Sequence, residues 1–153
     1  MAEMEPQPDE PQPDEPKLDA DRESAYELLQ RGQALIRSRH HAQAAIVLER
    51  AARIEPGKGS ILEPLGRAYH HSGQFERARE TLEALLDVDP SAHWAHFALA
   101  TTLRKLDRSS EARTHLRLAI ALSPGSALYR QALARLDEAS PPPADRPRPG
   151  DPG

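Results

Sequence analysis

The 153-residue sequence contains no cysteine, which excludes disulfides, thiolate nucleophiles and cysteine-ligated metals. No apolar run approaches the ~20 residues needed to span a bilayer. The first ten residues, MAEMEPQPDE, have neither the basic start nor the apolar stretch of a signal peptide. We therefore expect a cytoplasmic protein with no membrane segment.

A concentrated positive charge is absent as well. Residues 1–22 contain eight acids and two bases, and residues 139–153 are neutral. The stretch between them, residues 23–138, has 16 bases and 14 acids, which gives a net charge of about +2. A nucleic-acid-binding domain would carry a dense basic field. Nucleic acid is therefore not an expected partner.

Large apolar side chains are scarce at both ends of the chain, where proline is concentrated instead. Of the 15 prolines, 11 lie in residues 1–22 and 139–153. Such segments cannot bury enough apolar surface to offset the entropy lost on ordering. The sequence predicts an acidic, proline-rich disordered tail over residues 1–22, a folded domain over residues 23–138 and a second proline-rich disordered tail over residues 139–153.

What the central stretch does contain is a repeat. Pro56, Pro90 and Pro124 follow one another at intervals of 34 residues. The same interval separates the members of five further columns: Gly32, Gly66 and Ala100; Leu35, Tyr69 and Leu103; Ala44, Ala78 and Ala112; Leu48, Leu82 and Leu116; Ala51, Leu85 and Ala119. A fixed period of this length is typical of a solenoid in which each repeat is one pair of helices.

The residue types in these columns suit helix pairs. Glycine and alanine allow two helices to approach closely, and the large apolar residues at helical spacing fill the space beside them. Proline closes the second helix of each pair because it lacks an amide hydrogen. Gly73 and Asp107 fall in the turn within a unit, where a left-handed backbone is tolerated. Arg39 holds the equivalent place in the first unit, which leaves open a different construction of that turn.

The pattern resembles the tetratricopeptide repeat family over about residues 23–138. The resemblance is best in residues 59–90, with Leu65, Gly66, Tyr69, Gly73, Phe75, Ala78, Leu82 and Pro90. It implies an all-α fold, an α-solenoid of antiparallel helix pairs that form a right-handed superhelix with a concave inner face. The repeats would cover about residues 25–58, 59–92 and 93–126, and a capping helix would cover residues 126–138.

The expected helices are seven in number, at residues 22–37, 41–54, 61–72, 75–87, 92–105, 109–121 and 126–137. Ser60 and Glu63 have the spacing of a capping box for the third of them. The last helix has an apolar stripe and a polar outer side, as the end of a solenoid requires for solubility. We expect this helix to close the stack.

Catalysis and metal binding are both disfavoured by the pattern of residues. The sequence contains no nucleophile–base motif and no glycine-rich phosphate loop. Two pairs of adjacent histidines, at residues 40–41 and 70–71, point about 100° apart on a helix and make poor joint ligands. His93 and His96 could share a face, but no carboxylate is placed to complete a site. We expect neither an enzyme nor a cofactor or metal site.

In the resembling family, the first helix of each unit lines the groove. The corresponding positions here are Tyr26, Leu29, Gln33, Ile36 and Arg37 in the first unit, Ser60, Glu63, Arg67, His70 and His71 in the second, and Trp94, Phe97, Thr101, Arg104 and Lys105 in the third. This implies apolar surface at one edge of the groove and a row of cations at the other.

Two of these features have structural explanations that compete with partner binding. Cations in the last turn of a helix complement its macrodipole by ~0.3–1 kcal/mol wherever they point. Phe97 is expected to pack between repeats. Trp94 is expected to be exposed, because most members of the resembling family have a small or polar residue at its position. An exposed tryptophan beside cations is typical of an interaction site.

The resemblance implies an adaptor or scaffold that binds a protein or peptide segment in its groove, and the groove residues favour an acidic segment with an apolar anchor. A homo-oligomeric self-assembly module is the alternative. The Lys, Asn and Arg residues with which family members bind chaperone C-termini would fall at Leu29, Gln33, Pro64, Trp94 and Ala98, none of which is charged. The acidic tail could lie across the groove, or it could serve only solubility.

Overall fold

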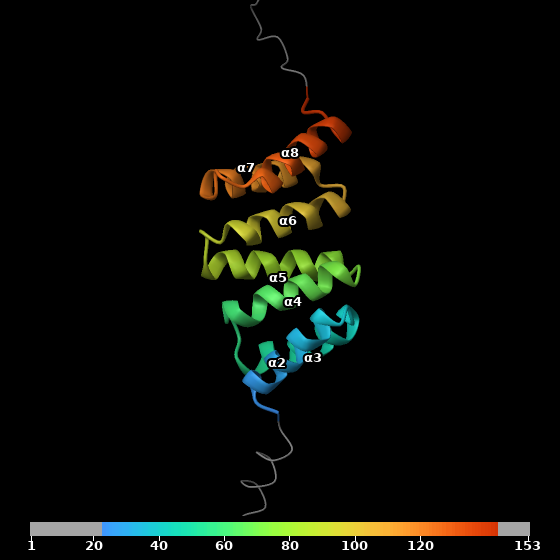
Figure 1. Cartoon of the computed structure of the whole chain (residues 1–153), viewed down its shortest axis with the longest axis vertical. Helices are drawn as coiled ribbons and strands as arrows, with labels where there is room; N and C mark the ends of the chain where they lie inside the picture. The colour runs from blue at the N-terminus through green and yellow to red at the C-terminus, as the bar shows by residue number, and fades with distance from the viewer. Residues whose placement is uncertain (1–22, 144–153) are drawn as a thin grey trace, which may run out of the picture.

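The computed structural model describes residues 23–143, which form seven α-helices and no strand (Figure 1). The expectations of disorder for residues 1–22 and for most of the C-terminal tail concern a region outside the described residues. The helices are α2 (Ala25–Arg37), α3 (His41–Ile54), α4 (Gly59–His71), α5 (Phe75–Val88), α6 (His93–Lys105), α7 (Ser109–Leu122) and α8 (Ala127–Ala139).

Successive helices run in opposite directions and stack in chain order, so α2, α4 and α6 all run the same way across the molecule (Figure 1). Each of these three packs against the helix that follows it, and α3 and α5 also pack against the next unit. This is the α-solenoid that the 34-residue period predicts. Because α2, α4 and α6 are parallel, their C-terminal turns lie along one edge of the stack.

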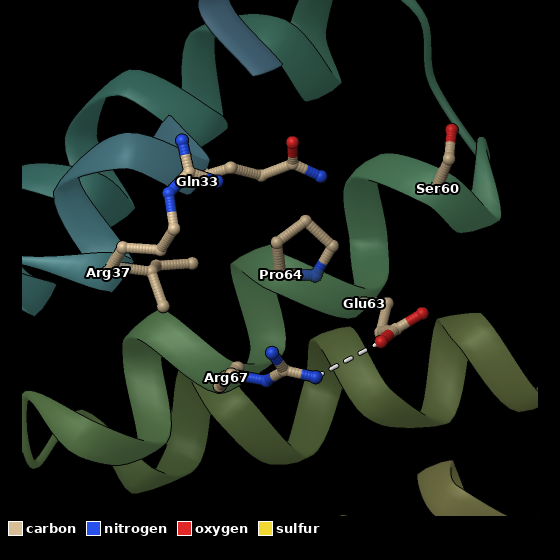
Figure 2. Close-up of a pocket in the computed structure, with 7 residues that line it drawn as sticks. Gln33, Arg37, Ser60, Glu63, Pro64 and Arg67 are labelled. Atoms are coloured by element: carbon tan, nitrogen blue, oxygen red, sulfur yellow. Dashed lines mark hydrogen bonds and ion pairs between the residues drawn. The ribbon is translucent and has the colours of Figure 1, made fainter. Parts of the chain in front are cut away.

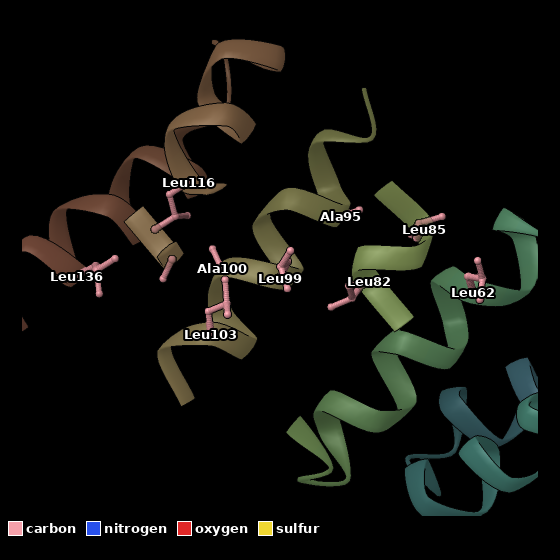
Figure 3. Packing of buried hydrophobic residues seen from close by; sticks show 10 residues of the cluster. Leu62, Leu82, Leu85, Ala95, Leu99, Ala100, Leu103, Leu116 and Leu136 are labelled. Atoms are coloured by element: carbon pink, nitrogen blue, oxygen red, sulfur yellow. The ribbon is translucent and has the colours of Figure 1, made fainter. Parts of the chain in front are cut away.

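The core consists of the columns that recur in the sequence. Leu48 and Leu82 are fully buried, and they lie directly over Gly32 and Gly66. A β-carbon at Gly32 would come within 2.5 Å of Leu48, and one at Gly66 within 2.9 Å of Leu82. The small residues are therefore needed for the close approach of the two helices. Figure 3 shows the cluster around Leu82 and Leu99 that continues to α8.

The turn inside each unit has one construction throughout. Arg39, Gly73 and Asp107 all have a left-handed backbone, with φ of 63°, 79° and 58°. In each turn the following residue donates its amide hydrogen to a carbonyl five residues earlier in the chain, as in His40 to Leu35 at 2.8 Å. The first turn is therefore built like the other two, and the expectation that it is built differently is wrong. The backbone hydrogen bonds hold Arg39 in the conformation that glycine adopts more easily.

The capping box predicted at Ser60 and Glu63 is also wrong. Helix α4 begins at Gly59, its N-cap Lys58 makes no side-chain cap, and Glu63 pairs with Arg67 instead. A capping box does exist at α2, where Ser24 accepts from the amide of Glu27 and the Glu27 carboxylate accepts from the amide of Ser24. This helix therefore begins at Ala25 and not at residue 22.

Helix α8 closes the stack, as its apolar stripe predicts. Tyr129 and Leu136 are buried, while Ala132 and Leu133 pack against the core cluster from partly buried positions. An ion pair between Arg113 and Asp137 adds to this packing. Arg113 of α7 is 6 % exposed and donates from Nε to Asp137 at 2.7 Å.

Candidate functional site

The first part of the site is a depression of about 410 Å³ between α2 and α4. Figure 2 shows its walls, with Gln33 and Arg37 from one helix facing Pro64 and Arg67 of the other. The complete lining is Gln33, Ile36, Arg37, Ser60, Glu63, Pro64 and Arg67. All seven side chains come from the first helices of units one and two.

A second depression of about 310 Å³ lies between α4 and α6. It is lined by Gly66, Arg67, His70, His71, Trp94, Phe97, Ala98, Thr101 and Arg104. Because Arg67 lines both depressions, they form one continuous groove along α2, α4 and α6. Below, "the groove" means these two depressions together.

Arg67 joins the two parts of the groove. Its Nη2 donates to Glu63 at 3.1 Å, and its guanidinium carbon lies 4.8 Å from the centre of the Trp94 ring. Trp94 is half-buried, whereas the sequence predicted an exposed side chain. One face of the indole is covered by a cation from the neighbouring unit, while Trp94 still lines the depression.

Phe97 packs as expected and also contributes to the groove. Its ring stacks on Tyr129 of α8 with the ring centres 5.0 Å apart. His93 is on the same helix and forms a 2.7 Å hydrogen bond between its Nδ1 and the Tyr129 hydroxyl. The closing helix therefore holds the apolar wall of the second depression in place.

Positive charge is gathered on the groove side of the solenoid. Helices α2, α4 and α6 carry five Lys and Arg against two Asp and Glu, whereas α3, α5 and α7 carry six of each. Arg37, Arg104 and Lys105 are exposed in the last turns of α2 and α6. None of the three forms an ion pair within residues 23–143. Their charges are therefore available to a partner.

Two histidines at the same edge have pKa values below the ordinary range of histidine. His70 is half-buried, and its Nδ1 lies 2.9 Å from the Thr102 hydroxyl. Burial lowers the pKa of His70, and the neighbouring positive charges of His71, Lys105 and Arg104 lower it further. Burial also lowers the pKa of His71, whose ring centre lies 4.8 Å from that of His41.

The structure brings most of the predicted groove residues together. Three of them, Tyr26, Leu29 and Lys105, line neither depression. Tyr26 is 68 % exposed near the start of α2, and Leu29 packs partly buried against the core. The prediction of the groove did not include Pro64, Gly66 and Ala98, which are small or compact residues that also line it. Their sequence signal is their position one helical turn from predicted lining residues.

The remaining histidines are engaged in separate contacts. His96 Nδ1 lies 3.0 Å from His115 Nδ1, and His96 Nε2 lies 2.9 Å from the Pro90 carbonyl oxygen. His93 bonds Tyr129, so His93 and His96 do not converge. Within residues 23–143, no three His, Asp or Glu side chains are grouped so as to hold a metal ion. None of the helices in this part of the chain is both long and apolar enough to cross a membrane.

Comparison with known proteins identifies the class. The family model described as tetratricopeptide repeat matches residues 29–79 and 63–127. Together these matches span well over half of the chain, which belongs to the tetratricopeptide repeat family. No curated protein is similar enough in sequence to count as a match.

Solved structures with the same fold include three of particular use. The first TPR domain of Spaghetti (RPAP3) bound to the HSP90 peptide SRMEEVD superposes with a TM-score of 0.72 at 16 % identity, covering 76 % of this chain and 92 % of that one. The Sgt2 TPR domain from Aspergillus fumigatus superposes with a TM-score of 0.69 at 23 % identity, and the match covers 80 % of this chain and 87 % of that one. MamA from Desulfovibrio magneticus RS-1, from residue 41 to its end, superposes with a TM-score of 0.75 at 19 % identity. The match covers 80 % of this chain and 69 % of that one.

Proposed function

We propose that this protein is a non-enzymatic scaffold that binds a segment of another protein in the groove along α2, α4 and α6. The observation that supports this most directly is the second depression. There Trp94 and Phe97 offer apolar surface beside the exposed base Arg104. Aromatic side chains and arginine are the residues that contribute most binding energy at protein interfaces.

The chemistry of the groove favours an acidic segment with an apolar anchor. The apolar anchor would enter between α4 and α6, against Trp94, Phe97 and Ala98. Carboxylates of the partner would then face the exposed bases Arg37 and Arg104 at the C-terminal edge of the helices. Each exposed ion pair contributes only ~0–1 kcal/mol, so the anchor would carry most of the affinity and the charges would set its direction.

One structural neighbour holds an HSP90 peptide, SRMEEVD, which provides a matched test of specificity. We propose that this chain does not bind it by the same charge pattern. The relevant positions here are Leu29, Gln33, Pro64, Trp94 and Ala98, and none carries a charge. The peptide should bind no more tightly than a scrambled peptide of the same composition in fluorescence titrations. Tighter binding of the native order would contradict this part of the proposal.

The groove itself is tested by comparing which proteins the wild-type chain and its variants capture. Trp94→Ala removes the apolar wall, and Arg104→Glu reverses one exposed charge. Ile46→Ala is the matched control, because Ile46 is 62 % exposed on α3, outside both depressions. A true groove partner should be lost with both groove variants and retained with the control. Equal retention by all variants would exclude the groove as the binding surface.

Self-assembly is the competing function, and a mass measurement separates the two. The proposed scaffold should sediment as a monomer at tens of micromolar. The exposed leucines near the C-terminal end, Leu122 and Leu128, are the surface on which a second copy would stack. A stable oligomer that Leu128→Asp dissociates would support the self-assembly function instead.

A further inference from the structure

The groove has an excess of positive charge that no described residue balances. Arg37 and the adjacent pair Arg104 and Lys105 are exposed, and they have no acidic partner within residues 23–143. The one acid that lines either depression, Glu63, is already paired with Arg67. An acidic segment is therefore the occupant that this surface fits.

The chain itself supplies a segment of this kind. Residues 1–22 carry eight acids and two bases, and residues 5–16 read EPQPDEPQPDEP. The repeat places the acid pairs Asp9–Glu10 and Asp14–Glu15 five residues apart. A proline-rich backbone is stiff and extended, so it loses less conformational entropy on binding than a flexible chain would.

The lengths allow the segment to reach the bases. The described chain begins at Glu23, beside the start of α2. Helix α2 has 13 residues, so Arg37 at its far end lies about 20 Å away. At about 3.1 Å per residue, the eight residues back to Glu15 span about 25 Å. The thirteen residues back to Glu10 span about 40 Å, enough to pass α4 and reach α6, since packed helix axes are about 10 Å apart.

We propose that residues 1–22 occupy the groove of their own molecule, with the two acid pairs facing Arg37 and Arg104 in the groove and Lys105 beside it. The proposal rests on the groove proposed above as the binding surface, and it adds that a partner must displace this segment. Each exposed ion pair raises the ratio of docked to undocked segment by at most about fivefold. The interaction is therefore partial, and salt with a screening length of a few ångströms weakens it.

Trp94 is a built-in reporter, because it is the only tryptophan in the chain and it lines the groove. The full chain carrying Asp14→Asn and Glu15→Gln is compared with wild type by acrylamide quenching of tryptophan fluorescence, at low salt and at 0.5 M salt. The matched control carries Asp87→Asn and Glu138→Gln, two exposed acids that make no ion pair within residues 23–143.

Loss of the tail acids should raise the quenching constant by about twofold at low salt, the size expected for partial occupancy held by exposed ion pairs. At 0.5 M salt the tail variant and wild type should agree, and the control should match wild type throughout. Arg104→Gln should give the same rise, and combining it with the tail variant should add nothing. Equal quenching of the tail variant and wild type at low salt would overturn the proposal.

Dilution distinguishes the molecule's own tail from that of a second copy. An effect that stays constant from about 100 to 1 µM supports occupancy within one molecule, since an intramolecular equilibrium does not depend on concentration. An effect that disappears on dilution would overturn this proposal in favour of exchange between copies. A partner whose capture requires Trp94 but does not change when the tail acids are replaced would support the proposed function and contradict this inference.

Discussion

The guanidinium of Arg67 lies over the Trp94 ring at 4.8 Å, and this contact joins α4 to α6 across the groove. The same side chain pairs with Glu63 in the preceding turn of its own helix. Arg67 therefore belongs to both the packing between repeats and the proposed binding surface.

Replacing Arg67 with alanine should lower the free energy of unfolding by about 1 kcal/mol, because an exposed cation–π contact contributes about 0.5–1 kcal/mol and the half-exposed ion pair adds little. Tryptophan emission should move to longer wavelength as the indole face becomes hydrated. Arg67→Lys keeps the charge but not the planar stack, so it should give an intermediate emission shift. Unchanged emission in both variants would show that the contact is absent in solution.

Arg39 and Gly73 occupy equivalent left-handed positions, so exchanging their residue types tests the turn. A non-glycine residue in this conformation costs about 1–2 kcal/mol. Arg39→Gly should therefore raise the melting temperature by a few degrees, despite the added entropy of the unfolded chain. Gly73→Arg should lower it, although a β-carbon there meets nothing within 4 Å. A melting temperature that falls in both variants would contradict this account.

Gly32 and Gly66 differ in how tightly they are covered, which predicts an order of effects. Alanine at Gly32 would collide with Leu48 at 2.5 Å, and alanine at Gly66 would meet Leu82 at 2.9 Å. Overpacking lowers the free energy of unfolding by about 1–3 kcal/mol. The higher helix propensity of alanine offsets about 1 kcal/mol of that loss. Denaturant unfolding should show the larger loss for Gly32→Ala. Gly66→Ala should show the smaller loss, in keeping with the buried Ala100 at the equivalent position in the third unit.

Stability should fall as the pH is lowered through the range where free histidine protonates. The pKa values of His70 and His115 are lowered in the folded protein, mainly by burial. Below the unfolded pKa of about 6.5, the unfolded chain binds more protons than the folded one, so protonation favours unfolding. Melting curves from pH 7.5 to about 5.5 should show this decline. The double variant His70→Gln and His115→Gln should flatten this decline, and a variant that keeps the wild-type slope would contradict the assignment.

Removing either partner of the ion pair between Arg113 of α7 and Asp137 of α8 should change the stability by a different amount. Asp137→Ala leaves the buried guanidinium of Arg113 without its carboxylate, which should cost about 3 kcal/mol. Arg113→Met replaces the cation with an apolar side chain of similar length, and it should cost much less because no buried charge remains. Thermal unfolding compares the two. A larger loss for Arg113→Met would show that the ion pair itself is strongly stabilising.

The sequence predicted the helices well because the period places a packed residue at every column. Leu48 and Leu82 are fully buried where that period puts them. What it did not predict depends on local hydrogen bonding. Ser60 and Glu63 have capping-box spacing, yet α4 starts one residue before Ser60 at Gly59 and carries no side-chain cap. The capping box at Ser24 has the same spacing, and only the position of the first turn distinguishes the two.

The groove could be anticipated in outline but not in its contacts. Arg67 and Trp94 were each expected to face the groove, but their meeting depends on the offset between α4 and α6, which no spacing within one helix reveals. The same holds for the lowered pKa of His70, which comes from burial and from neighbouring positive charges that include bases on α6. Contacts between repeats depend on three-dimensional packing, whereas membership of a face depends on periodicity alone.

Tyr129 belongs to the closing helix, yet it bonds His93 and stacks on Phe97 of α6. Helix α8 lies at the end of the stack and has two buried residues, Tyr129 and Leu136, so its local opening should cost less than that of an internal helix. Opening of α8 would release Phe97 from its stacking partner and loosen one wall of the groove. Occupation of the groove and docking of the terminal helix are thus thermodynamically linked: a ligand held against Phe97 must protect the α8 amides from hydrogen exchange, and loosening α8 must weaken that ligand by the same factor.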